Sequence, residues 1–223
     1  MKQADPPAQV FRLGRRPDPW AWPDWAFAEP DGTFGNRYDD PQGIYRVLYA
    51  STQRIATFVE CLACFRPDIE VIAELDAIAG EDGDEEPPVA GVVPSDWVEQ
   101  RCIGIGRLVG DHADIGHHES LAELRSALAP RVVHYELPDL DAATLRLTAP
   151  RAFTQEVSRY VFDRTVDGVR RWNGISYLSK HGDDLTNWAT FEPVMPDIIG
   201  VNECAADDVD LAAALELHGL RLA

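Results

Sequence analysis

The 223-residue sequence has few basic residues for its size, with 20 Lys and Arg against 38 Asp and Glu and a formal net charge of −18. This deficit argues against a nucleic acid or an anionic membrane as partner, since both attract cations. No stretch approaches the ~20 apolar residues of a membrane span, and the N-terminus lacks the apolar core of a signal peptide. We therefore expect a cytoplasmic protein, in which a site for a phosphorylated ligand would be a local feature.

Cysteine is also scarce, and four residues are too few for a disulfide scaffold in a chain of this length. Cys61 and Cys64 form a CxxC, but no second CxxC completes a zinc site, and both lie in an apolar run where cysteine acts as a small hydrophobe. His112, His117 and His118 cluster in a polar loop ahead of a predicted helix. We expect no metal site.

Several nucleotide and hydrolase motifs are missing. The sequence contains neither GxGxxG nor GxxxxGK[ST], so a Rossmann or P-loop site is not supported. Ser179 and His181 lie close together, yet no GxSxG elbow is present, which disfavours a serine-hydrolase triad.

Periodicity and turn residues predict a mixture of strands and helices without regular alternation, which favours the α+β class in one domain spanning residues 1–223. Residues 17–36, rich in Pro, Gly and Trp, are expected as a loop folded over the domain or lining a pocket, and the acidic residues 80–88 as a surface loop. We expect strands at 43–51, 69–78, 101–109, 131–139, 174–179 and 187–192, and helices at 53–65 (with Ser51 or Thr52 as N-cap), 119–129, 153–166 and 208–220.

A single carboxylate interrupts the apolar stretch IATFVECLACF, residues 55–65. In a helix, Glu60 lies nearly opposite the main apolar stripe but among small residues, so the helix is apolar nearly all round and should be buried or partly covered. Burial without a partner costs roughly 2 to 7 kcal/mol even for a neutral polar group. Glu60 is therefore expected either in an internal ion pair, with Arg37 or Arg54, or in an active site.

Three further residues occupy positions from which their side chains could bind a ligand or take part in catalysis. Arg37, in the turn FGNRYDDP, could bind a phosphate or carboxylate through its two-pronged guanidinium. Tyr49 ends an apolar strand, where a core tyrosine is the alternative interpretation. Ser179 ends a short strand before a polar turn.

These residues stand in an order that resembles the RES domain family, named for an arginine, a glutamate and a serine. Arg37 matches the arginine of G-x-R-[FY], Tyr49 the tyrosine of VLY-A, Glu60 the glutamate of A-x-x-E, and Ser179 the serine of G-I-x-Y-x-S. Arg12 resembles a basic residue that many members carry near their start. The likeness covers the first 65 residues and roughly residues 150–192.

The resemblance implies a compact fold like that of bacterial ADP-ribosyltransferases: a mixed sheet core, flanking helices, and an unmatched central insertion around residues 67–150. It implies an enzyme that consumes NAD, a phosphorylase or glycohydrolase, acting as the toxin of a toxin–antitoxin pair with a protein antitoxin as partner. NAD would be the substrate, not a cofactor, and inorganic phosphate a co-substrate. Ser176 stands where a basic residue is common in relatives.

In this family-based assignment Glu60 stabilises the cation-like ribose, and Arg37, with Arg12, holds the pyrophosphate. Tyr49 stacks on nicotinamide or ribose, and Ser179 binds the nicotinamide end. The alternatives are an ADP-ribosyltransferase with a protein target, or a silent binding module in which Arg37 and Glu60 form a structural ion pair. The acceptor, the role of the insertion and the oligomeric state stay open.

Overall fold

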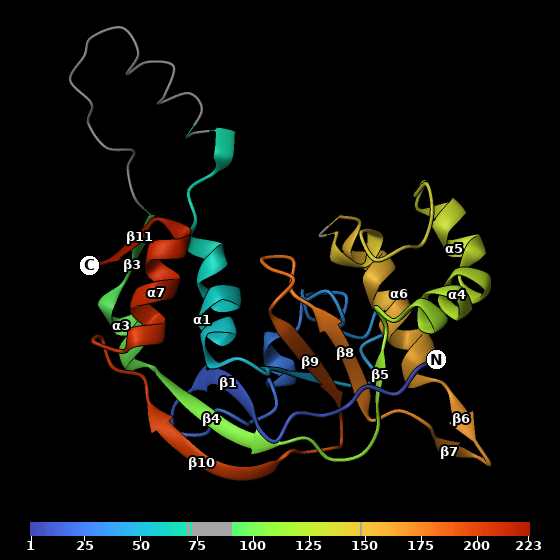
Figure 1. Ribbon diagram of the computed structural model, residues 1–223, viewed down its shortest axis with the longest axis horizontal. Helices are drawn as coiled ribbons and strands as arrows, with labels where there is room; N and C mark the ends of the chain where they lie inside the picture. Colours follow the sequence, from blue (N-terminus) through green and yellow to red (C-terminus); the bar gives the residue numbers. More distant parts are fainter. Residues whose placement is uncertain (71, 73–90, 148) are drawn as a thin grey trace, which may run out of the picture.

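A computed structural model describes residues 1–70, 72, 91–147 and 149–223 of the chain (Figure 1). Its centre is a seven-stranded sheet of order β10-β4-β1-β2-β9-β8-β5, in which neighbours are antiparallel except for the parallel pair β8 and β5. This mixed sheet with helices confirms the α+β class. None of the helices in the described ranges is long and apolar enough to cross a membrane.

The elements follow one another along the chain without a regular alternation of strand and helix. Their bounds are β1 Val10–Arg15, η1 Trp25–Phe27, β2 Val47–Ser51, α1 Arg54–Leu62, η2 Ala63–Phe65, β3 Gly91–Val93, α3 Ser95–Glu99, β4 Arg101–Arg107, β5 His112–Asp114, α4 His118–Ala127, α5 Ala129–His134, η3 Thr144–Arg146, α6 Arg151–Phe162, β6 Thr165–Val166, β7 Val169–Arg170, β8 Gly174–Leu178, β9 Thr186–Phe191, β10 Asp197–Glu203, α7 Val209–His218 and β11 Leu220–Leu222.

Most predicted elements are present near their predicted bounds. The expected strands at 43–51, 101–109, 174–179 and 187–192 are β2, β4, β8 and β9, and the expected helices at 53–65, 119–129, 153–166 and 208–220 are α1 with η2, α4, α6 and α7. The N-cap of α1 is Gln53 and not Ser51 or Thr52. Ser51 instead ends β2, with its hydroxyl bonded inside the sheet.

Two predicted strands are wrong where the structure describes them. Residues 129–134 form helix α5, because Leu128 and Val132, four residues apart, bury together against α6 and the sheet. In the strand expected at 69–78, the described residues Ile69, Glu70 and Ile72 are helical. Residues 71 and 73–78, like the acidic loop expected at 80–88, lie outside the described residues.

The segment 67–150, expected as an insertion, supplies two strands of the main sheet. β4 pairs with both β1 and β10, and β5 pairs with β8 at the opposite edge. No strand was predicted from the sequence at β1, β5 or β10. The segment 101–114 is therefore part of the central sheet and not an insertion outside it.

Helices gather over the two ends of the sheet (Figure 1). At one end α1 and α7 pack with β1, β4 and β11 around Phe58, Leu62 and Leu211. At the other end α4, α5 and α6 pack on β8 and β9 around Phe153 and Ile175. The space between these two hydrophobic cores is where the candidate site lies.

Candidate functional site

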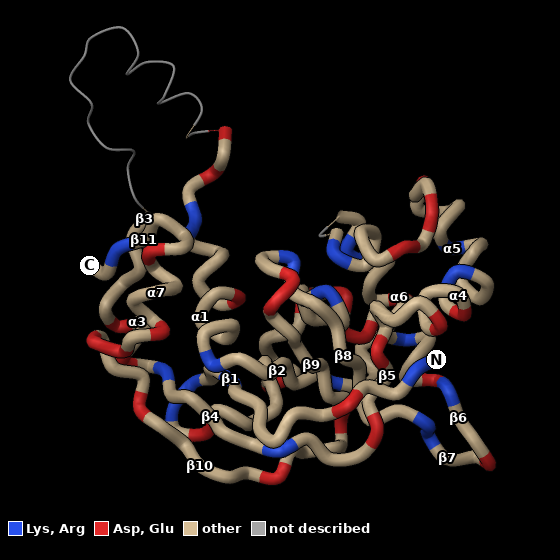
Figure 2. The backbone as a smooth tube through the Cα atoms, viewed as in Figure 1, with Lys and Arg blue, Asp and Glu red and all other residues tan. Residues whose placement is uncertain are grey.

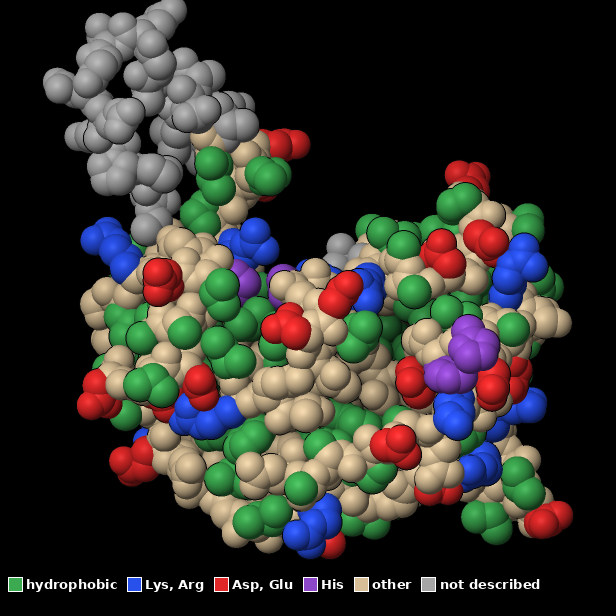
Figure 3. Space-filling view, viewed as in Figure 1, with side chains coloured by type: hydrophobic (Ala, Val, Ile, Leu, Met, Phe, Trp, Pro, Cys, Tyr) green, Lys and Arg blue, Asp and Glu red, His purple; other side chains and the backbone are tan. Residues whose placement is uncertain are grey.

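A cavity of about 590 Å³ opens between α1, β2 and the turn that joins β8 and β9. The space-filling view is hollowed between the two helical ends of the molecule (Figure 3). Arg12, Arg37, Tyr49 and Glu60, which lie in separate parts of the sequence, all line this cavity. Its volume falls in the usual range for small-molecule sites, about 300 to 1,000 Å³.

Glu60 is held by two short hydrogen bonds to a single oxygen. The Ser179 hydroxyl and the Asn187 side-chain amide both donate to Glu60 Oε1, each at 2.6 Å. The Ser51 hydroxyl donates to Asn187 Oδ1 at 2.6 Å, which fixes the orientation of that amide. Glu60 Oε2 accepts no hydrogen bond from the described residues and is the oxygen left for a ligand.

Strand pairing explains why these groups meet. Ser51 on β2 and Asn187 on β9 are direct cross-strand partners, and Tyr177 on β8 is the next partner in the same row. Tyr49 lies two residues before Ser51 and so points to the same face of the sheet. Helix α1 crosses this face, with Ala56, Phe58, Val59 and Leu62 buried and Glu60 turned toward the strands. The face of α1 opposite its buried stripe therefore lines the cavity.

The expected ion pairs of Glu60 are absent. Arg54 instead binds Asp208 and Asp210, and Arg37 donates to the Leu145 carbonyl at 3.4 Å. Among the described residues no guanidinium or ammonium lies within ion-pair distance of Glu60. The structural Arg37–Glu60 pair that defined the silent binding module is therefore wrong for the described part of the chain.

Arg12 and Tyr49 form a second hydrogen-bonded group. Arg12 donates through Nε to the Pro19 carbonyl at 2.7 Å and through Nη1 to the Tyr49 carbonyl at 2.8 Å. The Tyr49 hydroxyl donates to Asp39 Oδ1 at 2.7 Å and accepts from the Tyr38 amide at 3.2 Å. Burial raises the pKa of both Tyr49 and Asp39. The phenol is thus fixed as a neutral donor at the cavity wall.

Arg37 lies against two aromatic rings. Its guanidinium carbon is 5.3 Å from the ring centre of Tyr38 and 5.1 Å from that of Tyr177. One weak bond, to the Leu145 carbonyl, leaves most of its donors available. Arg37 can therefore reach an anion in the cavity while its aromatic contacts hold the side chain in place.

Positive charge dominates the cavity although acidic residues are spread over the whole fold (Figure 2). Arg12, Arg37, Arg151 and Lys180 line the cavity, against one carboxylate, Glu60, among the described lining residues. Burial, together with repulsion from Arg37 and other arginines, lowers the pKa of Lys180. Like charges brought together in this way favour an anionic ligand.

Sequence analysis missed Ser51, Asn187 and Arg151. The available signal for Asn187, which is 2% exposed, was an asparagine in the predicted strand NWATFE, where this residue type is depleted. Ser179 was expected to touch a ligand; it is fully buried behind Glu60 and is not among the lining residues. Its contact with the carboxylate is direct, whereas any contact with a ligand goes through Glu60.

The cysteines and histidines differ from their expected positions: Cys64 is exposed, and His112 is buried in β5 with its Nε2 3.2 Å from Thr190 Oγ1. Cys61 and Cys64 line the cavity as free thiols, and burial raises the pKa of the Cys61 thiol to about 11, so it is a poor nucleophile. His117 caps α4 by accepting from the Glu119 amide at 3.2 Å. With His118 and Glu119 it forms a cluster at the start of α4 whose possible metal-ligand atoms lie within 4.8 Å of one another.

Comparisons with family models, curated proteins and solved structures found no match for this chain.

Proposed function

We propose that this protein cleaves the bond between nicotinamide and ribose in NAD, as an NAD phosphorylase or glycohydrolase of the RES type with an ADP-ribosyltransferase-like fold. The observation that carries the proposal is the position of Glu60: its free oxygen Oε2 faces a cavity whose other charged lining residues are cations. A pyrophosphate needs cations, and a cation-like ribose needs a fixed carboxylate. Both requirements meet in one cavity.

The chemistry assigns a role to each group. As the C1′–N1 bond breaks, its electron pair goes to the nicotinamide nitrogen, which leaves neutral, and C1′ becomes cation-like. Glu60 stabilises this charge or holds the ribose hydroxyls, and Ser179 and Asn187 keep the carboxylate in place. Arg37, with Arg151, binds the pyrophosphate, and Tyr49 borders the ribose or nicotinamide. An oxygen of phosphate or of water then bonds to C1′, and a water acceptor releases one proton to solvent.

Arg12 has a more restricted role than the resemblance implies. Its Nε and one terminal nitrogen are bonded to backbone carbonyls, so the remaining terminal nitrogen offers a single point of contact to a phosphate. Its second contribution is to hold the β1–β2 region beside Tyr49. The toxin role and the protein antitoxin rest on the family resemblance alone, and we propose them on that ground.

The experiment that tests the function is NAD consumption by the purified protein, with and without inorganic phosphate, with the products separated by chromatography. Phosphorylated ADP-ribose formed only with phosphate would establish a phosphorylase, and ADP-ribose under both conditions a glycohydrolase. A protein carrying an ADP-ribosyl label would instead establish a transferase. NAD left intact both with and without phosphate contradicts the proposal.

A further inference from the structure

His181 lies in the turn between β8 and β9, lines the cavity, and plays no part in the contacts described above. Its side chain is 10% exposed, and Nε2 is buried without a hydrogen-bond partner among the described residues. Glu60 Oε2 lies 4.0 Å from this nitrogen. A buried ring nitrogen without a partner costs free energy, so its persistence beside a carboxylate needs a reason.

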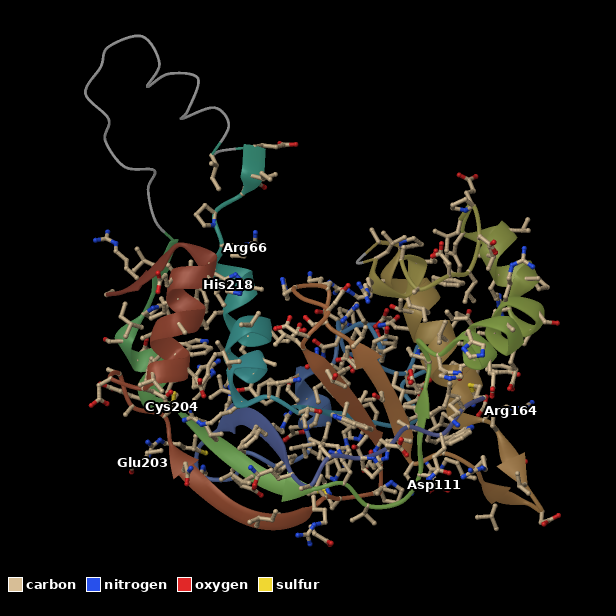
Figure 4. All side chains as sticks on the ribbon, viewed as in Figure 1. Arg66, Asp111, Arg164, Glu203, Cys204 and His218 are labelled. Atoms are coloured by element: carbon tan, nitrogen blue, oxygen red, sulfur yellow. The ribbon has the colours of Figure 1, made fainter. Side chains whose placement is uncertain are left out.

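The ring is held in this position from two sides. The His181 backbone amide donates to the Ser179 hydroxyl at 2.9 Å, the same hydroxyl that donates to Glu60. The ring packs edge-on against His218, with centroids 5.6 Å apart. His218, on α7 beside α1 (Figure 4), is itself bonded through Nε2 to the Val59 carbonyl at 2.8 Å. His181 is thus fixed against the helix that carries Glu60.

We propose that His181 is a positioning residue for Glu60. When NAD binds, the Nε2–H of His181 donates a hydrogen bond to Glu60 Oε2. This inference rests on the proposed function. Closing the gap from 4.0 Å to the usual length of about 2.9 Å takes a side-chain movement of roughly 1 Å. Ser179, Asn187 and His181 would then give the carboxylate three donors, one of them on the oxygen that faces the ribose, and hold it charged in one orientation.

The surroundings of His181 keep the imidazole neutral and able to donate one proton. Burial lowers the pKa of His181, and Lys180 in its own turn, His218 on α7 and Arg66 after α1 lower it further, against the opposite influence of Glu60. A neutral imidazole carries a proton on one nitrogen only. The proposal requires the tautomer with that proton on Nε2.

Two variants of His181 separate positioning from packing. His181→Phe keeps a ring against His218 and removes both nitrogens, whereas His181→Gln replaces Nε2–H with an amide donor at similar reach. We expect His181→Phe to lower kcat for NAD cleavage about 10- to 100-fold with little change in KM, and to move the acid limb of the pH–rate profile to higher pH, because the charged carboxylate loses a donor. His181→Gln should restore most of both.

The exposed His134, changed to Gln, is the matched control and should behave as the wild type. If the wild type cleaves NAD and His181→Phe has unchanged kcat and pH profile, the positioning role is wrong and the proposed function stands. Equal losses in His181→Phe and His181→Gln with an unshifted acid limb would also overturn it, as a packing effect. If the wild type leaves NAD intact, the proposed function fails, and this role fails with it.

Discussion

Helix α1 carries two charged residues, Arg54 in its first turn and Glu60 in its second, and their surroundings are opposite. Arg54 has charged partners within the protein. It binds Asp208 and Asp210 at the start of α7, and its guanidinium carbon lies 5.5 Å from the ring centre of Phe58. Glu60 has no cationic partner among the described residues. One of its oxygens accepts from neutral donors and the other faces a cavity.

The difference shows how to distinguish a structural charge from a functional one on the same helix. A charge whose partners are carboxylates or guanidinium groups of the protein stabilises the fold and has no capacity left for a ligand. A carboxylate that is oriented by hydroxyl and amide groups keeps its negative charge uncompensated. Arg54 therefore belongs to the packing of α1 on α7, and Glu60 to the cavity.

The largest expected effect is on turnover by Glu60→Gln. Glutamine keeps an Oε1 that accepts from Ser179 and Asn187 but removes the charge, so NAD cleavage should fall about 10²- to 10³-fold while the midpoint of unfolding stays near the wild-type value. The measurement is kcat for NAD together with urea unfolding of the same preparation.

The exposed Glu99, changed to Gln, is the control for loss of one negative charge. Wild-type turnover in Glu60→Gln would show that the Glu60 carboxylate takes no part in NAD cleavage. A large loss of stability in that variant would instead place Glu60 in the same class as Arg54 and remove the contrast between them.

Local patterns predicted β2, β8, β9 and α1, which carry much of the site, but not β1, which carries Arg12. Period-2 alternation identified β2, the polar turn between two short segments identified β8 and β9, and the apolar helix with one carboxylate singled out Glu60. The alternative expectation, that Glu60 forms an ion pair with Arg37 or Arg54, was wrong. Arg54 pairs instead with Asp208, which is 154 residues away in the sequence. Nothing local in the sequence connects Arg54 with Asp208.

The parts that were missed depend on strand pairing at a distance. Asn187 meets Glu60 only because β9 lies beside β2 and places it opposite Ser51. The strand expected at 131–139 became helix α5 because burial of Leu128 and Val132 against the second core outweighed a β-like composition. Sequence separation and tertiary packing, and not residue type, set these limits.

A smaller effect is expected on stability from Arg54→Met. The change leaves Asp208, whose side chain is 9% exposed, next to Asp210 with no cation between them. Loss of charged hydrogen bonds of this kind costs roughly 1.5 to 3 kcal/mol in the free energy of unfolding. Urea unfolding measures it, and NAD turnover at a temperature where the variant is folded should be unchanged.

Arg125→Met is the control for that variant, since Arg125 pairs with Asp139 in an exposed position. Its unfolding midpoint should match the wild type, because exposed ion pairs contribute little. An Arg54→Met variant as stable as Arg125→Met would mean that the contacts of Arg54 with Asp208 and Asp210 do not stabilise the fold. Arg54 would then not be a structural charge in contrast to Glu60.

The smallest effect concerns the acid side of the stability curve. The hydrogen bond from Arg54 lowers the pKa of Asp208 below its usual value, so its contribution to stability is fully present above the unfolded-state pKa, near 3.8, and is lost as the pH falls through the folded-state pKa. Asp208→Asn should therefore show a shallower loss of stability below about pH 4. Asparagine can still cap α7 through its side-chain oxygen, so the helix start is kept. Asp207→Asn, an exposed neighbour, should retain the wild-type slope, and identical slopes in all three proteins would show that the Arg54–Asp208 contact is not maintained in solution.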